Sequence, residues 1–156
     1  MIQIIIPGYH SLRLQHLVMD YNGTLAQDGL LLEGVRSRLE RLAGQLRLHV
    51  ITADTFGMAS GQLHGLPCEL VILPVEEQAQ GKLAYIDNLG RDQVAAIGNG
   101  RNDRLMLEAA ALGIALIQGE GAAFEALSTA DVIMPNIQLA LDAFLYRKRL
   151  IATLRS

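Results

Sequence analysis

The chain has 156 residues, of which 51% are apolar and 4% aromatic, and Cys68 is its single cysteine. This length suits one domain, residues 1–156, with an aliphatic core, and a single cysteine excludes an internal disulfide. The formal net charge of -3 excludes a global field that would attract nucleic acid. No apolar run approaches the roughly 18 residues of a membrane span, and no basic region opens a secretory signal. We therefore expect a soluble, cytoplasmic protein with neither nucleic acid nor membrane as a partner.

The chain opens with an apolar segment that contains a turn signal. Residues 2–6 are followed by Pro7-Gly8, and a second apolar segment then ends at Asp20. Pro-Gly is a strong turn dipeptide. We expect residues 2–6 to pair antiparallel with the strand that ends at Asp20, which gives a small N-terminal β-hairpin.

Downstream, short apolar runs alternate with helical patterns. Amphipathic spacing predicts helices over residues 33–43, 102–112 and 136–154. Strands that are buried on both faces read as continuous apolar runs, and their alternation with helices is typical of a parallel sheet covered on both sides. The predicted fold class is therefore α/β, a three-layer α/β/α Rossmann-like domain. The runs interpreted as strands are residues 17–19, 48–51, 69–73, 94–97, 114–117 and 131–134.

Polar residues follow three of these predicted strands. Asp20 ends the first, residues 52–54 (TAD) follow the second, and residues 98–103 (GNGRND) follow the fourth. Ligands of open α/β sheets bind beyond the carboxyl ends of the strands, so these residues should meet. Lys82 lies on the predicted helix that leads into residues 94–97. A carboxylate nucleophile, a hydroxyl, an ammonium and a second carboxylate are the groups that Mg²⁺-assisted phosphoryl transfer uses.

At these positions the sequence resembles the haloacid dehalogenase superfamily, and within it the phosphorylation domain of P-type ATPases. The D-x-x-G-T element of the family is similar to residues 20–24, and its T-G-D element to residues 52–54. Its lysine ahead of a G-D-G-x-N-D loop matches Lys82 ahead of residues 98–103. Four motifs in the expected order make the resemblance specific, and similarity extends over most of residues 17–135.

The resemblance implies a role for each motif residue. Asp20 would be the phosphorylated nucleophile and a Mg²⁺ ligand, with the backbone carbonyl of Asn22 as a further ligand. Asp103 would complete the metal shell, directly or through water. The phosphoryl group or the substrate would contact Thr52, Ala53, Lys82 and Asn102.

Two positions depart from the family pattern. Phosphatases of this superfamily place a second Asp two residues after the nucleophile, where it acts as general acid and base, but this chain has Asn22. P-type ATPases have Thr there, and their acyl phosphate hydrolyses slowly. Asn99 replaces the usual Asp of the G-D-G loop. Its amide oxygen can still bind Mg²⁺, but one negative charge is missing and metal affinity should fall. We expect a slow phosphatase, or one whose leaving groups need no proton.

Several readings stay open at this point. The spacing leaves no room for a cap or nucleotide-binding domain, so the site should be open to a large phosphorylated substrate or to a neighbouring subunit in a homo-oligomer. The same pocket could belong to a phospho-acceptor domain or a pseudoenzyme that binds Mg²⁺, phosphate or a partner protein. Taken singly, Asp20 could cap a turn, Lys82 could lie on the surface, and Thr52 and Asp54 could cap a helix. Residues 119–124 (GEGAAF) are interpreted as a simple turn rather than an anion site.

Overall fold

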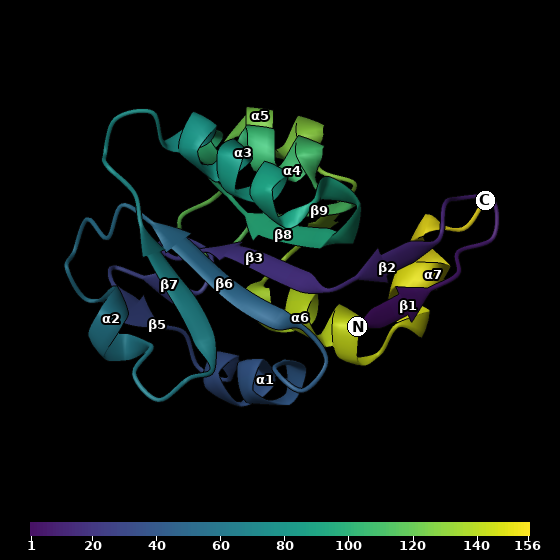
Figure 1. Cartoon of the computed structure of the whole chain (residues 1–156), viewed down its shortest axis with the longest axis horizontal. Helices are drawn as coiled ribbons and strands as arrows, with labels where there is room; N and C mark the ends of the chain where they lie inside the picture. Colours follow the sequence, from purple (N-terminus) through teal and green to yellow (C-terminus); the bar gives the residue numbers. More distant parts are fainter.

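The computed structural model describes all residues, 1–156, and its centre is a parallel sheet (Figure 1). Six strands are hydrogen-bonded in the order β10-β9-β8-β3-β6-β7, and each pair is parallel. Every predicted strand is confirmed to within two residues at each end. The strands are β3 (His16–Asp20), β6 (Arg47–Thr52), β7 (Cys68–Ile72), β8 (Val94–Gly98), β9 (Leu112–Leu116) and β10 (Val132–Met134).

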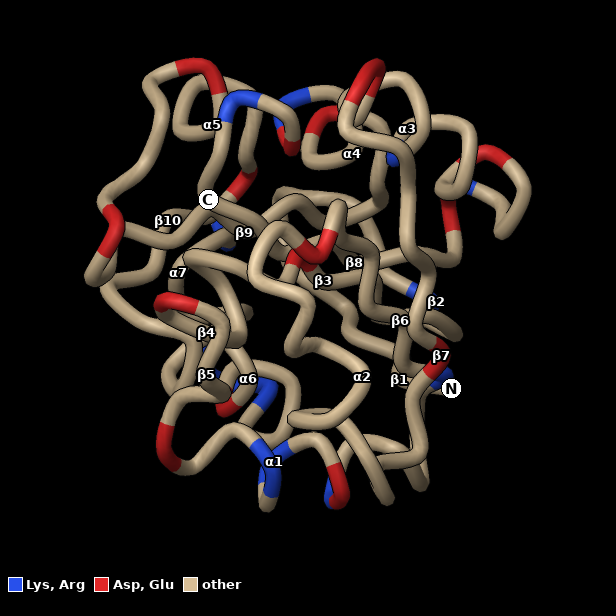
Figure 2. The backbone as a smooth tube through the Cα atoms, turned by 90° about the vertical axis from the view of Figure 1, so that its left-hand side faces the viewer, with Lys and Arg blue, Asp and Glu red and all other residues tan.

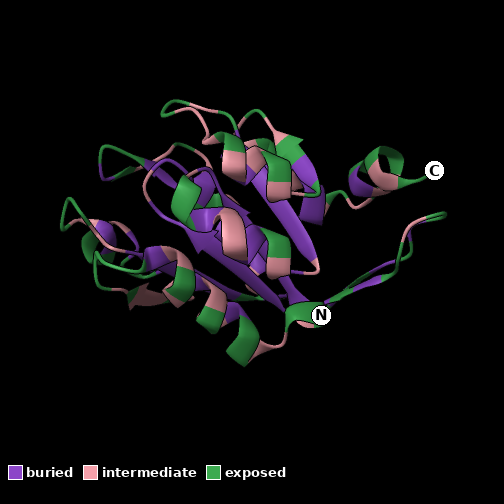
Figure 3. Cartoon of the chain, turned by 90° about the horizontal axis from the view of Figure 1, so that it is seen from above, coloured by how far each residue is buried: buried purple, intermediate pink, exposed green.

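Helices cover both faces of this sheet, which confirms the three-layer prediction (Figures 1 and 3). On one face lie α3 (Gln78–Leu89), α4 (Arg104–Ala109) and α5 (Phe124–Thr129). On the other lie α1 (Val35–Leu42) and α6 (Ile137–Leu145). Successive side chains of β3 alternate between the two cores, with Leu17 and Met19 on the α1 and α6 side and Val18 on the α3 and α4 side. Burial on both faces explains why the strand is apolar throughout.

The N-terminal hairpin is confirmed, but its second strand differs from the prediction. β1 (Ile2–Ile4) pairs antiparallel with β2 (Leu12–Leu14), which is separate from β3. The chain changes partners at Gln15, whose N–H donates to Gln93 O and whose carbonyl accepts from Arg47 N–H. Both edges of β3 are occupied by the parallel strands β6 and β8, so the antiparallel pairing has to end before it.

Two predicted helices are shorter than expected. The stretch over residues 136–154 is divided into α6 and α7 (Lys148–Leu154), because Tyr146 has the non-helical angles φ -119 and ψ 69. The stretch over residues 102–112 contains only a 3-10 turn, η2 (Arg101–Asp103), and α4, since Leu112 already begins β9. A side chain at Gly113 would meet the backbone of Leu107 at 2.2 Å, so strand and helix pack directly on each other.

A second hairpin was not predicted. β4 (Ala26–Gln27) and β5 (Leu30–Leu31) pair antiparallel just after Asp20. Asp28 and Gly29 at its turn both have positive φ, 51 and 82, as a two-residue Asp-Gly hairpin turn requires. The Asp-Gly dipeptide was the signal in the sequence. Only this hairpin and α1 separate β3 from β6, so no cap domain is inserted there.

The strand order reverses beside β3. The chain runs from β3 outward through β6 and β7, and α2 (Ala59–Gln62) is the helix that connects those two strands along the sequence. It then returns past β3 to β8, which η1 (Arg91–Gln93) precedes. Figure 2 views the molecule from the carboxyl ends of the strands and shows acidic positions at the centre, where β3 and β8 end. A reversal of strand order is where open α/β sheets form their binding crevice.

None of the helices is long and apolar enough to cross a bilayer.

Candidate active site

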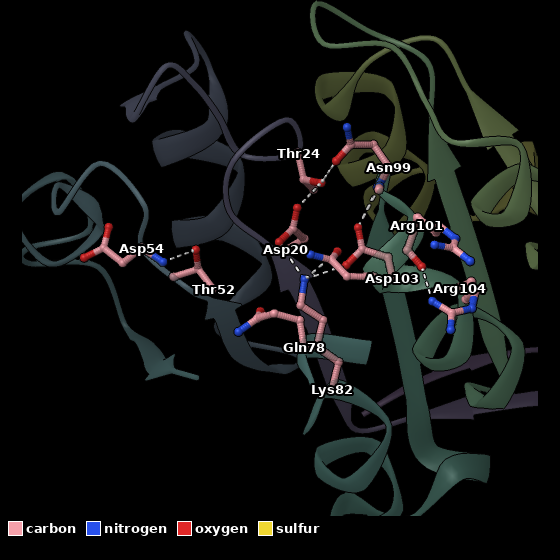
Figure 4. A network of polar contacts seen from close by, with 12 residues as sticks. Asp20, Thr24, Thr52, Asp54, Gln78, Lys82, Asn99, Arg101, Asp103 and Arg104 are labelled. Atoms are coloured by element: carbon pink, nitrogen blue, oxygen red, sulfur yellow. Dashed lines mark hydrogen bonds and ion pairs between the residues drawn. The ribbon is translucent and has the colours of Figure 1, made fainter. Parts of the chain in front are cut away.

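A buried lysine joins the two acidic motif residues of the site (Figure 4). Asp20 is the last residue of β3, and its Oδ1 accepts a hydrogen bond from Lys82 Nζ at 2.8 Å. The same Nζ donates to Asp103 Oδ1 at 2.6 Å and reaches Asn102 Oδ1 at 3.4 Å. Lys82 is 0% exposed, although it projects from helix α3. The interpretation of Lys82 as a surface lysine is therefore wrong, and its spacing in the motif was the informative signal.

Asp103 holds the loop that follows β8. Its Oδ2 accepts hydrogen bonds from the N–H groups of Asn99 at 3.0 Å and Gly100 at 2.9 Å, while its Oδ1 is paired with Lys82. A Cβ at Gly98 would lie 2.5 Å from the Asp103 carboxylate, so only glycine permits this approach. Both oxygens of Asp103 are thus engaged, which favours contact with a metal through water over direct ligation.

The ionisation of this group follows from its burial. Burial raises the pKa of Asp20 to about 6, repulsion from Asp103 adds to the rise, and Lys82 opposes it. Burial alone would lower the pKa of Lys82, but Asp20 and Asp103 raise it above the ordinary value for lysine. Lys82 therefore stays a cation throughout the physiological range. Strongly perturbed groups at the mouth of a crevice are typical of functional sites.

Two motif asparagines, Asn22 and Asn99, line the site together with Asp20. Thr24 Oγ1 is 3.4 Å from Asp20 Oδ2 and 3.3 Å from Asn99 Oδ1, so one hydroxyl reaches both side chains. The Oδ1 atom of Asn22 is buried and has no hydrogen-bond partner. Buried oxygens are rarely left unpaired in native proteins unless a water, ion or ligand meets them. Mg²⁺ prefers hard oxygen ligands, so Asp20, Asn22 and Asn99 fit such an ion.

Residues 52–54 form the opposite wall of the site. Thr52 is 3% exposed, and its Oγ1 accepts a hydrogen bond from the N–H of Asp54 at 2.9 Å, which leaves the hydroxyl proton available to a ligand. Asp54 Oδ1 accepts from the N–H groups of Met58 and Ala59, at 3.0 Å each. This confirms Asp54 as the cap of the turn that leads into α2, so it has a structural role.

These walls enclose a polar cavity of about 200 Å³. Lys82 and Asp103 lie behind it, and the other residues predicted for the site line it directly. Sequence reasoning missed three of the lining residues, Thr55, Gln78 and Glu120. The lining residues are Asp20, Asn22, Thr52, Ala53, Thr55, Gln78, Asn99, Gly100, Asn102 and Glu120.

Gln118 supports the loop after the nucleophile and was also missed. Its Nε2 donates to the carbonyls of Gly23 at 3.0 Å and Thr24 at 2.7 Å, and its Oε1 accepts from the N–H of Ile137 at 2.9 Å. One side chain therefore joins the Asp20 loop to the start of α6. No motif identifies this residue, because its partners are distant in the sequence.

Comparison with known proteins identifies the family. A family model described as haloacid dehalogenase-like hydrolase matches residues 78–137, which include Lys82 and the GNGRND loop. An uncharacterised protein of Methanocaldococcus jannaschii is 40% identical over 78 residues, which is 47% of this chain and 84% of that protein. The chain belongs to the haloacid dehalogenase superfamily. It is thus a hydrolase by family, as the sequence motifs predicted.

Two further proteins similar to this chain are phosphatases. Phosphoserine phosphatase of Idiomarina loihiensis is 37% identical over 76 residues, 48% of this chain but only 34% of that enzyme. The crystal structure of 3-deoxy-D-manno-octulosonate 8-phosphate phosphatase from Moraxella catarrhalis holds magnesium, phosphate and the KDO molecule. It superimposes with a TM-score of 0.68 at 17% identity and covers 91% of this chain and 94% of its own. This likeness shows the shared fold, and the specific resemblance to P-type ATPases stays a prediction.

Proposed function

We propose that the protein is a Mg²⁺-dependent phosphohydrolase that forms an aspartyl-phosphate at Asp20. The observation that supports this most directly is the buried group of Asp20, Lys82 and Asp103, which meets the polar cavity at the reversal of strand order. A buried ammonium between two carboxylates contributes little net stability compared with apolar residues of the same volume, so a functional role explains it better. The phosphatase names of two relatives agree with this proposal.

The reaction would use the residues in the following way. The phosphoryl group enters the cavity, where the ammonium of Lys82 and the hydroxyl of Thr52 bind its oxygens. A carboxylate oxygen of Asp20 attacks phosphorus, an acyl phosphate forms, and the leaving group departs with the electron pair of its P–O bond. Water then attacks the acyl phosphate, which releases inorganic phosphate and restores Asp20. Mg²⁺ held by Asp20, Asn22 and Asn99 would offset the negative charge that gathers there.

The amide of Asn22 defines the limit of this mechanism. An amide can donate a hydrogen bond, but it cannot give a proton to the leaving group or take one from water. General acid-base groups contribute about 10²–10⁴-fold to rate, so turnover of alkyl phosphates should be slow. Aryl phosphates, whose leaving groups are stable as anions, should react faster.

The test is hydrolysis of para-nitrophenyl phosphate with and without Mg²⁺. Wild-type protein, Asp20→Asn and Asp92→Asn are compared. Asp92 is an exposed acid in η1, so Asp92→Asn is a control that removes the same charge far from the site. We expect Mg²⁺-dependent turnover in wild type and Asp92→Asn and none in Asp20→Asn. Folded wild-type protein without turnover would refute the phosphohydrolase.

Asn22 supports a second candidate, a phospho-acceptor that keeps its acyl phosphate. Without a general base beside Asp20, the second step is the slower one, and the phosphorylated form would accumulate. Intact mass measured after incubation with acetyl phosphate and Mg²⁺ separates the two functions. A persistent adduct, absent from Asp20→Asn, would favour the acceptor. Absence of adduct, turnover and Mg²⁺ binding would leave a pseudoenzyme that binds a partner protein.

A further inference from the structure

The metal ligands proposed above carry little negative charge. Asn22 and Asn99 are neutral, and the Asp103 carboxylate is already paired with Lys82 and two backbone N–H groups. Asp20 also shares its Oδ1 with Lys82. Two carboxylates face one ammonium, so a single negative charge remains for a divalent cation. Such a site would bind Mg²⁺ weakly unless another anion lies close.

Glu120 places a further carboxylate at the same cavity. Its Oε2 lies 2.5 Å from the point where a Cβ of Gly23 would stand, and so does Nδ2 of Asn99. The carboxylate oxygen and the amide nitrogen are therefore no farther apart than twice that distance. Glu120 also borders the neighbouring hollow of about 180 Å³ that Gly23 and Gln118 line. No hydrogen bond or ion pair engages its carboxylate, and Arg101, which follows the lining residue Gly100, is paired with Glu125 at 3.1 Å.

The loop that contains Glu120 is held in place by Asn99 itself. Asn99 Nδ2 donates to the carbonyl of Gly121 at 3.1 Å, and the Asn99 carbonyl accepts from the N–H of Ala123 at 2.9 Å. Gly121 has φ 74, as in the simple turn expected for residues 119–124. Two bonds from one asparagine therefore fix the backbone on the C-terminal side of Glu120 beside the position where the family has an acid.

We infer that Glu120 supplies the negative charge that Asn99 lacks and holds the divalent cation together with Asp20. This inference rests on the proposed Mg²⁺-dependent function. With Glu120 included, the site has three carboxylates and the one ammonium of Lys82, and the remaining charge equals that of one divalent cation in magnitude. Gly23 has a part in this arrangement, since any side chain there would displace both the Glu120 carboxylate and the Asn99 amide.

Calorimetric titration with MgCl₂ tests the inference without using catalysis. The proteins are wild type, Glu120→Gln, Asn99→Asp, the double variant of the two, and Glu40→Gln, which removes an exposed acid from α1. Loss of a supporting carboxylate should weaken Mg²⁺ affinity about tenfold, the lower end of the range for groups around a metal. Glu40→Gln should bind like wild type. Asn99→Asp should restore the affinity that Glu120→Gln loses, because it returns one charge to the same site.

The outcomes separate this inference from the proposed function. Equal Mg²⁺ affinity in wild type and Glu120→Gln would overturn the inference, and Mg²⁺-dependent turnover by wild type would still stand. If Asn99→Asp does not restore the Mg²⁺ affinity that Glu120→Gln loses, the inference that Glu120 replaces the charge missing at Asn99 is overturned. If Glu120→Gln weakens Mg²⁺ binding and Asn99→Asp restores it, but wild type hydrolyses nothing, the inference holds and the phosphohydrolase fails. Glu120 is exposed and unbonded, so Glu120→Gln should melt like wild type.

Discussion

Replacement of Lys82 by methionine should be the most disruptive single change at the site. Methionine fills a similar volume, but it leaves the carboxylates of Asp20 and Asp103 facing each other without the ammonium that now lies 2.8 and 2.6 Å from them. Removing one partner of a buried ion pair costs about 3–5 kcal/mol. For a domain of this size, that loss lowers the unfolding midpoint by about 10 °C. We also expect Mg²⁺-dependent turnover to fall about a hundredfold or more.

The stability loss should depend on pH with a definite sign. In wild type the pKa of Asp20 is already raised to about 6 by burial, and it rises further without Lys82. A folded-state pKa above that of the unfolded chain means that the folded protein binds more protons, so this contribution to stability is lost as pH rises. The Lys82→Met deficit should therefore be smaller at pH 5 than at pH 8.

Urea denaturation in Mg²⁺-free buffer at these two pH values measures the effect. Lys148, the only other lysine and an exposed one, gives the matched control Lys148→Met, which should change stability little. A Lys82→Met protein within 1 kcal/mol of wild type, a loss of at most about fivefold in the folding equilibrium, would refute the reasoning. A loss of stability that is the same at both pH values would show that the unpaired carboxylates of Asp20 and Asp103 are not its cause.

Three further predictions concern the asparagines and a histidine pair. Asn22→Asp should speed hydrolysis of alkyl phosphates by about a hundredfold, measured as kcat, and no gain would show that residue 22 is not at the general-acid position. Asn99→Asp should tighten Mg²⁺ binding in calorimetry by about tenfold, and unchanged affinity would remove Asn99 from the metal site. His16 Nδ1 and His49 Nε2 are 3.0 Å apart, and burial lowers the pKa of both. Their contribution to stability is present above the ordinary histidine pKa and lost as pH falls below it. His49→Gln should therefore flatten the decline of the melting temperature between pH 7 and pH 5, and an unchanged slope would contradict this.

The sequence predicted the parts of the site that follow from local patterns. Asp20, Thr52 and the GNGRND loop lie at strand ends, and an apolar run marks each of those ends. Parallel packing then brings them to one edge whatever the details of the connections. Lys82 was found only through its spacing, since nothing in its neighbourhood separates a buried lysine from an exposed one. The Asp28-Gly29 dipeptide is a clear hairpin signal, but the prediction of a parallel sheet did not include this hairpin.

The missed residues share a physical reason. Gln118 bonds to Gly23 and Thr24, and Glu120 approaches Gly23 and Asn99, all across gaps in sequence that no periodicity connects. The predicted end of the helix over residues 102–112 was wrong for a related reason, because α4 has to end before β9 begins. Local sequence propensity does not predict contacts that form only through tertiary packing.

Under the proposed mechanism, the arrangement of charge also explains how the two amides would be compatible with catalysis. A buried lysine between two carboxylates is present before any ligand binds, so the proposed phosphoryl site would be organised in advance. Neutral residues at 22 and 99 reduce the repulsion that such an acidic centre would otherwise store around Asp20, whose pKa is already raised. The expected cost is a missing proton donor and a weaker metal site. Only the second of these can be corrected from outside the motif, by a carboxylate on a neighbouring loop. Glu120 is the one unpaired acid that lines the cavity, so in the proposed arrangement it supplies that charge, and no second acid is left to replace the proton donor.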